Sequence, residues 1–173
     1  MTPQEFQTQL NRLSAEFKDF FDTVGPRVIG KVAVGMFKQN FMDEGFFGDK
    51  WKDVKRRSDP KNFKTITRGK SKGEVRANAW ARRPILAGAT GCLRRSIQVK
   101  EAANGHVIIW TDPNSFIGSK EPYGRVHNEG LRAGSGRGFM MPKRQFIGDH
   151  PKLREAIITE LERQLNKFNI SIQ

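Results

Sequence analysis

Residues 93–111, which read LRRSIQVKEAANGHVIIWT, carry the clearest strand pattern in the chain. The first half alternates polar residues with the apolar residues Leu93, Ile97 and Val99, and Arg95 interrupts the apolar face. A second β-rich run starts at His106, and Asn104-Gly105 between the two runs is typical of a type I′ turn. The pattern therefore predicts an antiparallel hairpin whose first strand starts at Leu93.

Amphipathic helices are predicted before the hairpin. Thr2, Pro3 and Glu5 have the spacing of a capping box with proline at the first helical position. Gly25-Pro26 is expected to stop or kink the helix. Apolar residues recur at helical spacing on both sides of that dipeptide: Phe6, Leu10, Leu13, Phe17, Phe20 and Val24, and then Val28, Ile29, Val32, Ala33, Met36, Phe37 and Phe41. Two partners fit the first stripe: the rest of the chain, which we favour, and copies of itself in an oligomer.

Shorter elements and a last helix are predicted after the hairpin. Residues 123–129 fit a short strand or one helical turn, the Gly-rich residues 131–138 fit a loop, and residues 139–147 fit one more strand. A closing helix is expected to be capped by Asp149 or His150, with Pro151 in its first turn. Its apolar stripe is Leu153, Ile157, Leu161, Leu165 and Phe168.

This order of elements predicts an α+β fold in a single domain, with one antiparallel sheet covered on one face by helices. The expected parts are N-terminal helices at 1–44, a basic loop or arm at 45–84, the sheet at 85–148 and a C-terminal helix at 149–173. Residues 45–84 show no sustained period apart from a short strand expected near Phe63–Ile66. A loop of this length indicates a binding loop or an arm ordered by a partner, and we expect it to be disordered in the free protein.

Composition excludes several classes of protein. The chain has 173 residues, 36% of them hydrophobic, and a mean hydropathy of −0.62. No segment approaches the roughly 20 apolar residues of a membrane span, and no secretory leader opens the sequence. Cys92 is the single cysteine, which rules out an internal disulfide and a cysteine-based zinc cluster. We expect a protein made in a reducing cytoplasm, without a membrane partner.

The positive charge is concentrated in one segment. The chain has 31 Lys and Arg against 18 Asp and Glu, a net charge of +13, and residues 50–84 hold 13 of the basic and 3 of the acidic residues. Such a segment is expected to be extended, solvated or in contact with an acidic partner. We favour a contact over a loop that only aids solubility, because Trp51, Phe63 and Trp80 interrupt the charges. The candidate contact residues are Lys55, Arg56, Arg57, Arg68, Lys70, Lys72, Arg76, Arg82 and Arg83.

No catalytic, metal or cofactor site is predicted. His106, His127 and His150 lack partners at metal-ligand spacing. His127-Asn128 lacks the companion residues of a His-Asn-His nuclease, and the glycines of residues 134–138 lack the spacing of a phosphate loop. Cys92 has no nameable base partner. An enzyme is therefore the weakest of the function classes considered.

Four stretches in order resemble a known family. They are FMDEGFFGDKW (41–51), PILAGATGCLRRSIQV (84–99), YGRVHNEG (123–130) and MPKRQFIG (141–148). Together, over residues 28–165, they are similar to the phage virion morphogenesis proteins, the tail-completion or neck group that includes the Mu-like morphogenesis protein. The residues that carry the resemblance are Trp51, Thr90, Gly91, Leu93, Tyr123, His127, Gly130, Pro142, Arg144, Phe146 and Gly148.

The resemblance implies a non-enzymatic virion protein at the neck or tail end, assembled in the host cytoplasm, with a tail-terminator-like fold. It implies a homo-oligomeric ring, expected to be a hexamer, that joins a head-side connector or adaptor to tail tube or terminator proteins. Tail completion, terminator and adaptor remain alternative stations, and the basic loop could face packaged DNA in the lumen or a neighbouring protein. The alternative function is a stand-alone basic nucleic-acid-binding protein.

The residues of the four stretches also have structural explanations. Gly91 can turn the chain, Pro142 needs no ladder donor, and Phe146 suits a core. We favour fold maintenance over direct contact for these three and for Thr90 and Gly148. For His127 and Arg144 the two interpretations are balanced.

Overall fold

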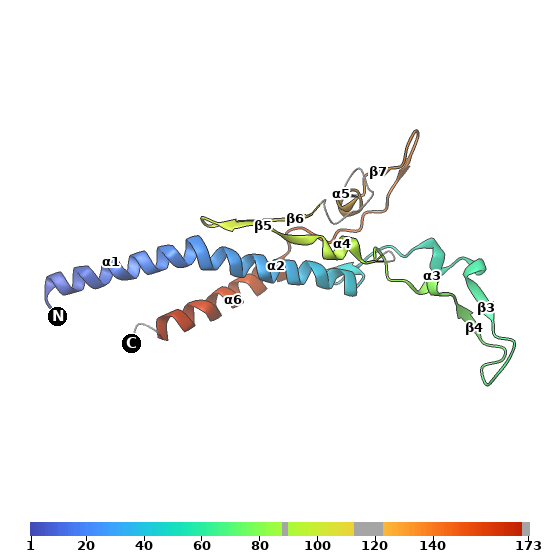
Figure 1. The fold of residues 1–173 in the computed structure, drawn as a ribbon, viewed down its shortest axis with the longest axis horizontal. Helices are drawn as coiled ribbons and strands as arrows, with labels where there is room; N and C mark the ends of the chain where they lie inside the picture. The colour runs from blue at the N-terminus through green and yellow to red at the C-terminus, as the bar shows by residue number, and fades with distance from the viewer. Residues whose placement is uncertain (88–89, 113–122, 171–173) are drawn as a thin grey trace. The chain divides into compact units, whose positions relative to one another are not determined.

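The computed structural model describes residues 1–87, 90–112 and 123–170, with backbone only for residues 168–170. The chain divides into two compact units. The first unit comprises Met1–Phe37, Ile97–Asp112 and Asp149–Gln173, and the second comprises Lys38–Ser96 and Pro113–Gly148. Figure 1 shows the order of the elements along the chain.

Helix α1 (Pro3–Asp19) opens the first unit with the predicted capping box. The Glu5 amide donates to the Thr2 hydroxyl at 3.2 Å, and the Thr2 amide donates to the Glu5 carboxylate at 2.7 Å. These bonds satisfy amides that a helix start leaves without partners. No residue of α1 is buried. The expectation that its stripe packs within the chain is therefore wrong for this helix, and only Phe20, just beyond it, reaches the core.

A single π-helical segment, η1 (Phe20–Val24), joins α1 to α2 (Gly25–Met42), so the helix continues through the predicted break. Pro26 has no N–H and cannot donate to the carbonyl of Asp22. The amide of Asn104, from a distant part of the chain, donates to that carbonyl at 2.9 Å. The π turn and this bond together accommodate the proline.

The predicted hairpin is present and consists of β5 (Ile97–Ala103) and β6 (His106–Thr111). Asn104 and Gly105 have φ values of 51° and 73°, as a type I′ turn requires. The ladder is interrupted by a bulge between Val99 and Glu101. The hairpin lies on α2 at Gly30, where an added Cβ would come within 2.7 Å of the Cγ2 atom of Val99.

This close approach makes Gly30 sensitive to substitution. We expect Gly30→Leu to lower the free energy of unfolding by about 1–3 kcal/mol, because the new side chain must displace a β-branched residue of the hairpin. The matched control is Gly35→Leu in the same helix, where an added Cβ meets nothing within 4 Å. There the better helix propensity of leucine should leave stability unchanged or raised by up to about 1 kcal/mol. Urea unfolding of both variants tests the pair, and equal losses would contradict the packing of the hairpin on α2.

Helix α6 (Pro151–Ile170) completes the first unit. The His150 Nδ1 atom accepts from the Lys152 amide at 3.2 Å, which confirms the predicted capping by that residue. Leu153 is buried, and an added Cβ at Gly25 would lie 3.9 Å from Leu161, so α6 lies beside the start of α2. The predicted stripe residue Phe168 lies outside the described side chains.

The second unit has an aromatic core. Phe41 from α2, Trp51 and Phe146 are all buried. The ring centroids of Phe41 and Trp51 lie 5.5 Å apart in an edge-to-face arrangement, and those of Phe41 and Phe146 lie 4.9 Å apart. The Trp51 indole N–H donates to the carbonyl of Gln145 at 2.8 Å. The core thus joins the end of α2 to the segment before α6.

Short elements surround this core. Strands β1 (Gly45–Phe46) and β2 (Asp49–Lys50) form one hairpin, and β7 (Arg132–Ala133) and β8 (Phe139–Met140) form another. The loop predicted at residues 131–138 is wrong in part, because it contains β7. The strand predicted within residues 139–147 is present as the two-residue β8.

Two further predictions concern short helices. Residues 123–129 were predicted as a strand or one helical turn and contain α5 (Gly124–Glu129). Helix α4 (Cys92–Arg95) replaces the predicted start of the hairpin at Leu93. Gly91, with a φ of 65°, starts this turn, and the hydroxyl of Ser96 donates to the Leu93 carbonyl at 2.7 Å as it ends.

Residues 45–84 are an arm with regular structure, and the expected disorder is not observed. The predicted strand near Phe63 is present. Beyond β1 and β2, the arm contains η2 (Lys55–Arg57), η3 (Pro60–Asn62), β3 (Phe63–Thr65), β4 (Val75–Ala77) and α3 (Ala79–Arg82). The α+β class is thus confirmed. Its antiparallel strands form four separate two-stranded ladders among the described residues, where one sheet had been expected.

Candidate functional site

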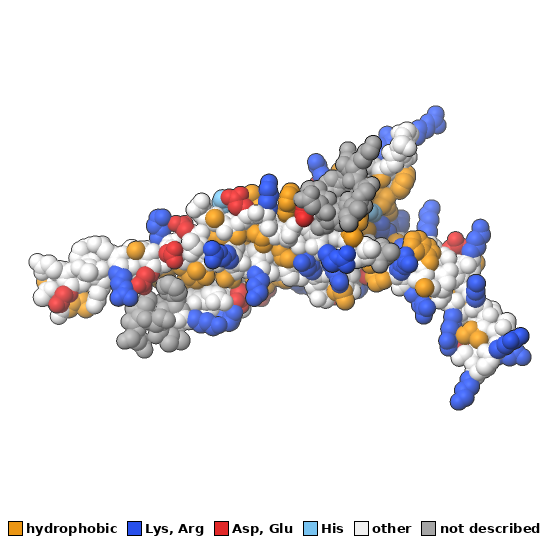
Figure 2. Space-filling model, in the orientation of Figure 1, with side chains coloured by type: hydrophobic (Ala, Val, Ile, Leu, Met, Phe, Trp, Pro, Cys, Tyr) orange, Lys and Arg blue, Asp and Glu red, His pale blue; other side chains and the backbone are white. Residues whose placement is uncertain are grey.

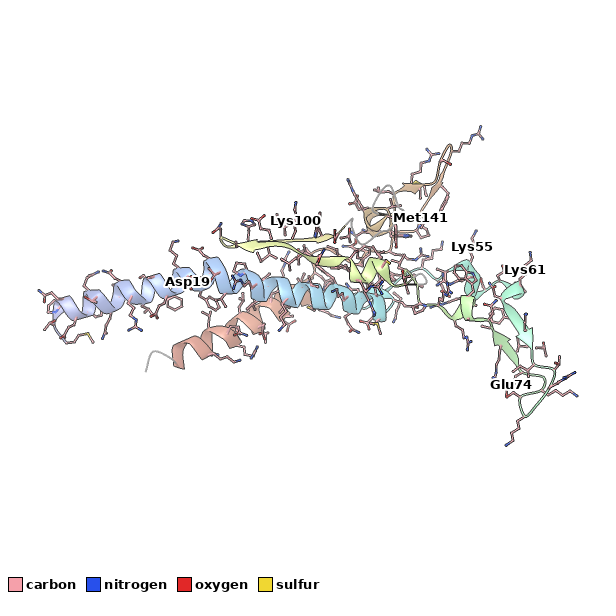
Figure 3. All side chains as sticks on the ribbon, viewed as in Figure 1. Asp19, Lys55, Lys61, Glu74, Lys100 and Met141 are labelled. Atoms are coloured by element: carbon pink, nitrogen blue, oxygen red, sulfur yellow. The ribbon has the colours of Figure 1, made fainter. Side chains whose placement is uncertain are left out.

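The nine candidate contact residues of the arm fall into an outer group of six and an inner group of three, Arg56, Arg57 and Arg83. The outer group is exposed on η2, the β3–β4 hairpin and α3 (Figure 2). Figure 3 shows side chains projecting outward around the labelled Glu74 of the hairpin. The ion pairs of the arm within the described residues involve Arg57 and Arg76 alone. The outer group comprises Lys55, Arg68, Lys70, Lys72, Arg76 and Arg82.

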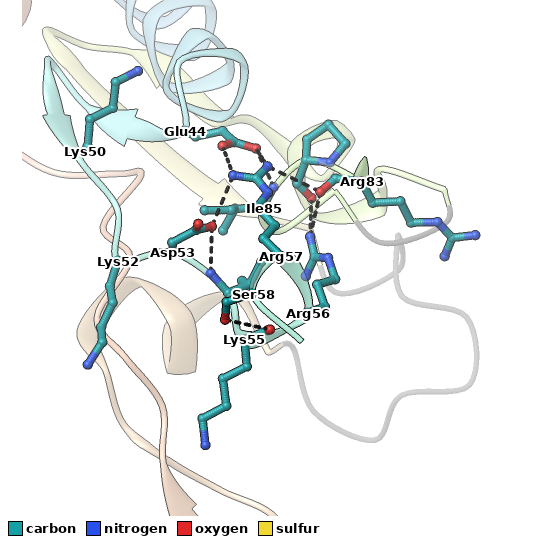
Figure 4. Close-up of polar contacts among 12 residues, drawn as sticks. Glu44, Lys50, Lys52, Asp53, Lys55, Arg56, Arg57, Ser58, Arg83 and Ile85 are labelled. Carbon is teal, nitrogen blue, oxygen red and sulfur yellow. Dashed lines mark hydrogen bonds and ion pairs between the residues drawn. The ribbon is translucent and has the colours of Figure 1, made fainter. Parts of the chain in front are cut away.

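In the inner group, Arg57 is bound by Glu44 (Figure 4). The two Nη atoms of Arg57 donate to the two carboxylate oxygens of Glu44 at 2.7 and 2.5 Å, and one of them also lies 3.2 Å from Asp53. The Ile85 amide donates to Glu44 at 2.8 Å. The hydrogen bonds from Arg57 lower the pKa of Glu44, although partial burial opposes the shift. This pair ties both ends of the arm to the end of α2.

Arg56 and Arg83 both lie over the ring of Trp80. Their guanidinium carbons lie 5.3 and 5.2 Å from the centroid of the Trp80 ring, within cation–π range. Arg56 also donates to the carbonyls of Arg83 and Pro84 at 2.7 and 3.1 Å. Its Nε atom is buried and has no hydrogen-bond partner among the described residues. Burial, followed by the charge of Arg57, lowers the pKa of Arg56.

Arg144 is the most deeply buried cation among the described residues, with 5% of its surface exposed. Its Nε and Nη2 atoms donate to the carbonyl of Lys52 at 3.2 and 3.0 Å. Burial lowers the pKa of Arg144, the charge of Arg56 adds to that effect, and Asp53 opposes it. The segment 141–148 is thus fastened to the start of the arm by a cation that has no ion pair with a carboxylate of the described residues.

His127 lies beside this cation, and Tyr123 packs edge to face on its ring at 5.8 Å between centroids. Its backbone carbonyl accepts from the Arg144 amide at 2.8 Å. Burial and the charge of Arg144 lower the pKa of His127, so the neutral imidazole is favoured. The Nδ1 atom is buried without a hydrogen-bond partner in the described part of the chain.

These side chains line one pocket of about 310 Å³ in the second unit. Its described lining contains three arginines and a histidine but no acidic residue. Guanidinium groups on an apolar wall suit a carboxylate or another planar anion. The lining residues are Val54, Arg56, Trp80, Arg83, Pro84, Ile85, Leu86, Tyr123, His127, Met141 and Arg144.

The remaining family-like residues hold the backbone. Leu93 and Phe146 are each 1% exposed, and an added Cβ at Gly130, where φ is 73°, would lie 2.9 Å from the Cβ atom of Lys143. Gly148 packs near the side chain of Gln145. Thr90 lies 2.8 Å from the sulfur of Cys92 on an exposed turn. Pro142 is half-buried in a segment without ladder pairing.

Two asparagines that hold the backbone, the buried Asn40 and the half-buried Asn128, were not among the predicted site residues. Asn40 is 2% exposed, donates to the Phe146 carbonyl at 3.2 Å and accepts from the Phe47 amide at 3.0 Å. Asn128 accepts from the amides of Phe146 and Ile147, both at 2.9 Å. The only sequence signal was an asparagine on the apolar face of a predicted helix, at position 40. Together these residues fix the backbone around Phe146.

The described residues show neither a metal site nor a membrane helix. They contain no group of three or more His, Cys, Asp or Glu residues that could hold a metal ion. No described helix combines the length and apolar character needed to cross a bilayer.

Comparison with known proteins identifies a family. The sequence model of the phage virion morphogenesis family matches residues 2–166 of 173. No curated protein and no solved structure matches the chain.

Proposed function

The chain belongs to the phage virion morphogenesis family, and from that premise we propose that it acts at the head–tail junction of a tailed phage. The family membership makes it a virion-associated protein with a structural or assembly role. In our proposal it completes or caps the tail and joins it to the neck. It does so as a ring, expected to be a hexamer, between a head-side connector or adaptor and tail tube or terminator proteins.

The structure of the arm is the observation that supports this proposal in addition to family membership. The inner arginines are used within the chain, by Glu44, by Trp80 and by backbone carbonyls. They hold a scaffold that presents the outer group to solvent. Repeated around a ring, such a hairpin gives a dense positive surface that attracts packaged DNA in the lumen or acidic faces of neighbouring proteins.

A phage lacking this protein is expected to accumulate heads and tails that do not join. Electron microscopy of lysates from a null phage, with the wild-type gene supplied in trans as the control, measures this directly. Normal joined particles from the null phage, or absence of the protein from purified virions, would overturn the proposed station.

Removing charge from the outer group tests its role. We expect the triple variant Arg68→Gln, Lys70→Gln, Lys72→Gln to restore joining poorly in the null phage. The same change outside the arm, Arg125→Gln, Arg137→Gln, Lys143→Gln, removes equal charge and should restore joining fully. Equally poor rescue by both triple variants would show that the net charge matters and the arm does not, and full rescue by both would show that these three arm cations are not needed.

The same outer group supports the second candidate function, a stand-alone nucleic-acid-binding protein. Filter binding of the free protein to duplex DNA at two salt concentrations measures it. Each phosphate contact contributes about 0.9 to the slope of log affinity against log salt. The arm triple variant should therefore lose about 2.7 from that slope if its three cations bind phosphates. An absence of binding at low salt removes this candidate and leaves the ring proposal unaffected.

A further inference from the structure

Helix α1 presents an apolar stripe that nothing in the described chain covers. Phe6 is 57% exposed and Leu10 is 45% exposed, and Phe17 belongs to the same face. Helix formation alone does not require phenylalanine and leucine to share one face of a helix. A contiguous exposed apolar face on a protein usually marks a binding surface.

The first unit also contains an open groove of about 690 Å³ between α2 and α6. Apolar side chains of η1 and α2 line it, together with polar side chains of α6. The lining residues are Val24, Arg27, Val28, Lys31, Val32, Gly35, Met36, Glu160, Arg163 and Gln164. At Gly35 the groove is open enough that an added Cβ meets no atom within 4 Å.

The α1 helix of the same chain cannot fill this groove. It is continuous with α2 through η1, and the residues at the two junctions, Phe20 and Gly25, are both right-handed helical. Its 17 residues therefore extend about 25 Å onward from α2. To lie beside α2 it would have to break the helix at η1 and lose the burial of Phe20. An α1 helix that fills this groove must therefore come from another molecule.

The charges of the stripe and the groove are complementary. Helix α1 holds Glu5, Glu16 and Asp19 against Arg12 and Lys18. In the groove, Arg163 and Gln164 donate to Glu160 and lower the pKa of that carboxylate to about 2, so it stays ionised and paired. That pairing leaves Arg27 and Lys31 as the groove cations without an ion pair in the described part of the chain. A slightly acidic amphipathic helix fits this lining.

We propose that α1 of one copy binds in the α2–α6 groove of a second copy of this chain. The donated helix and the receiving groove are different surfaces of one molecule, so the contact is head-to-tail. Such a contact repeats from copy to copy and closes into a ring when the rotation allows. This inference rests on the ring of the proposed function and names the surfaces that build it.

Two variants test the two sides of the contact separately. Leu10→Asp places a charge in the apolar stripe, and Gly35→Trp fills the groove at a position where the folded chain has room. Each variant alone should lose the oligomer in sedimentation velocity runs, with the dissociation constant raised about 30-fold or more, as for a central interface residue. The control is Ala15→Asp, on the opposite face of α1, which should assemble like the wild type.

Mixing the two variants gives the distinguishing result. Leu10→Asp keeps an intact groove and Gly35→Trp keeps an intact α1, so the mixture should form a 1:1 heterodimer and nothing larger. Pairing of α1 with α1 predicts no effect of Gly35→Trp and no heterodimer, and that outcome overturns the inference. Assembly of both single variants into wild-type oligomers also overturns it. The head–tail joining assay is independent of these runs, so the proposed function can stand while this contact fails.

Discussion

Replacing Phe146 with alanine is expected to lower the free energy of unfolding by about 3–5 kcal/mol. Its ring is 1% exposed and packs on Phe41 at 4.9 Å, and its backbone is held by Asn40 and Asn128. The backbone bonds prevent the segment from collapsing into the space that the ring leaves, so the cavity term should be large. Urea unfolding followed by tryptophan fluorescence measures the loss, because Trp51 lies in the same core.

Phe139→Ala is the matched control. The same atoms are removed at a position that is 61% exposed, on the small hairpin β7–β8. We expect a change of less than about 0.5 kcal/mol there. A loss at Phe146 that is no larger than the loss at Phe139 would show that Phe146 does not belong to a fixed core.

Local signals in the sequence predicted much of the fold. The capping box at Thr2, the type I′ turn at Asn104-Gly105 and the cap at His150 each involve residues a few positions apart, so spacing alone reveals them. The helix through Gly25-Pro26 was misjudged for the opposite reason. The bond that accommodates Pro26 comes from Asn104, which is distant in sequence.

The candidate site was predicted as one set of basic residues. The sequence could not show which of them belong to the outer group and which to the inner group. Arg56 and Arg57 adjoin Lys55 in one basic run, yet they point inward while Lys55 is exposed. What separates them is contact with Glu44 and with the carbonyls near residue 84, and these partners lie 13 and 27 or more residues away. The same contacts hold the arm in its ordered conformation. Composition does not reveal contacts between residues distant in sequence, and the composition of the arm therefore suggested disorder.

Glu44→Ala should therefore destabilise the arm strongly. The change leaves the Arg57 guanidinium without its bidentate partner and the Ile85 amide without an acceptor. Both donors are partly buried, so water replaces the carboxylate incompletely. We expect a loss of about 2–4 kcal/mol in the free energy of unfolding. Limited proteolysis should then cut the arm between Arg56 and Arg76, where trypsin sites are abundant in the sequence.

The pH dependence of stability provides a second measurement on the same residue. The pKa of Glu44 is lowered from its ordinary value of 4.5, chiefly by the hydrogen bonds from Arg57. A depressed folded-state pKa means that the stabilisation is complete above the unfolded value and is lost as pH falls through the folded value. The difference in stability between wild type and Glu44→Gln should thus be constant above about pH 5 and shrink below 4.5.

Glu74→Ala, which breaks the exposed pair with Arg76, should cost less than about 1 kcal/mol. If Glu44→Ala costs no more than Glu74→Ala, or if the Glu44→Gln difference does not vary with pH, the Glu44–Arg57 pair does not hold the arm.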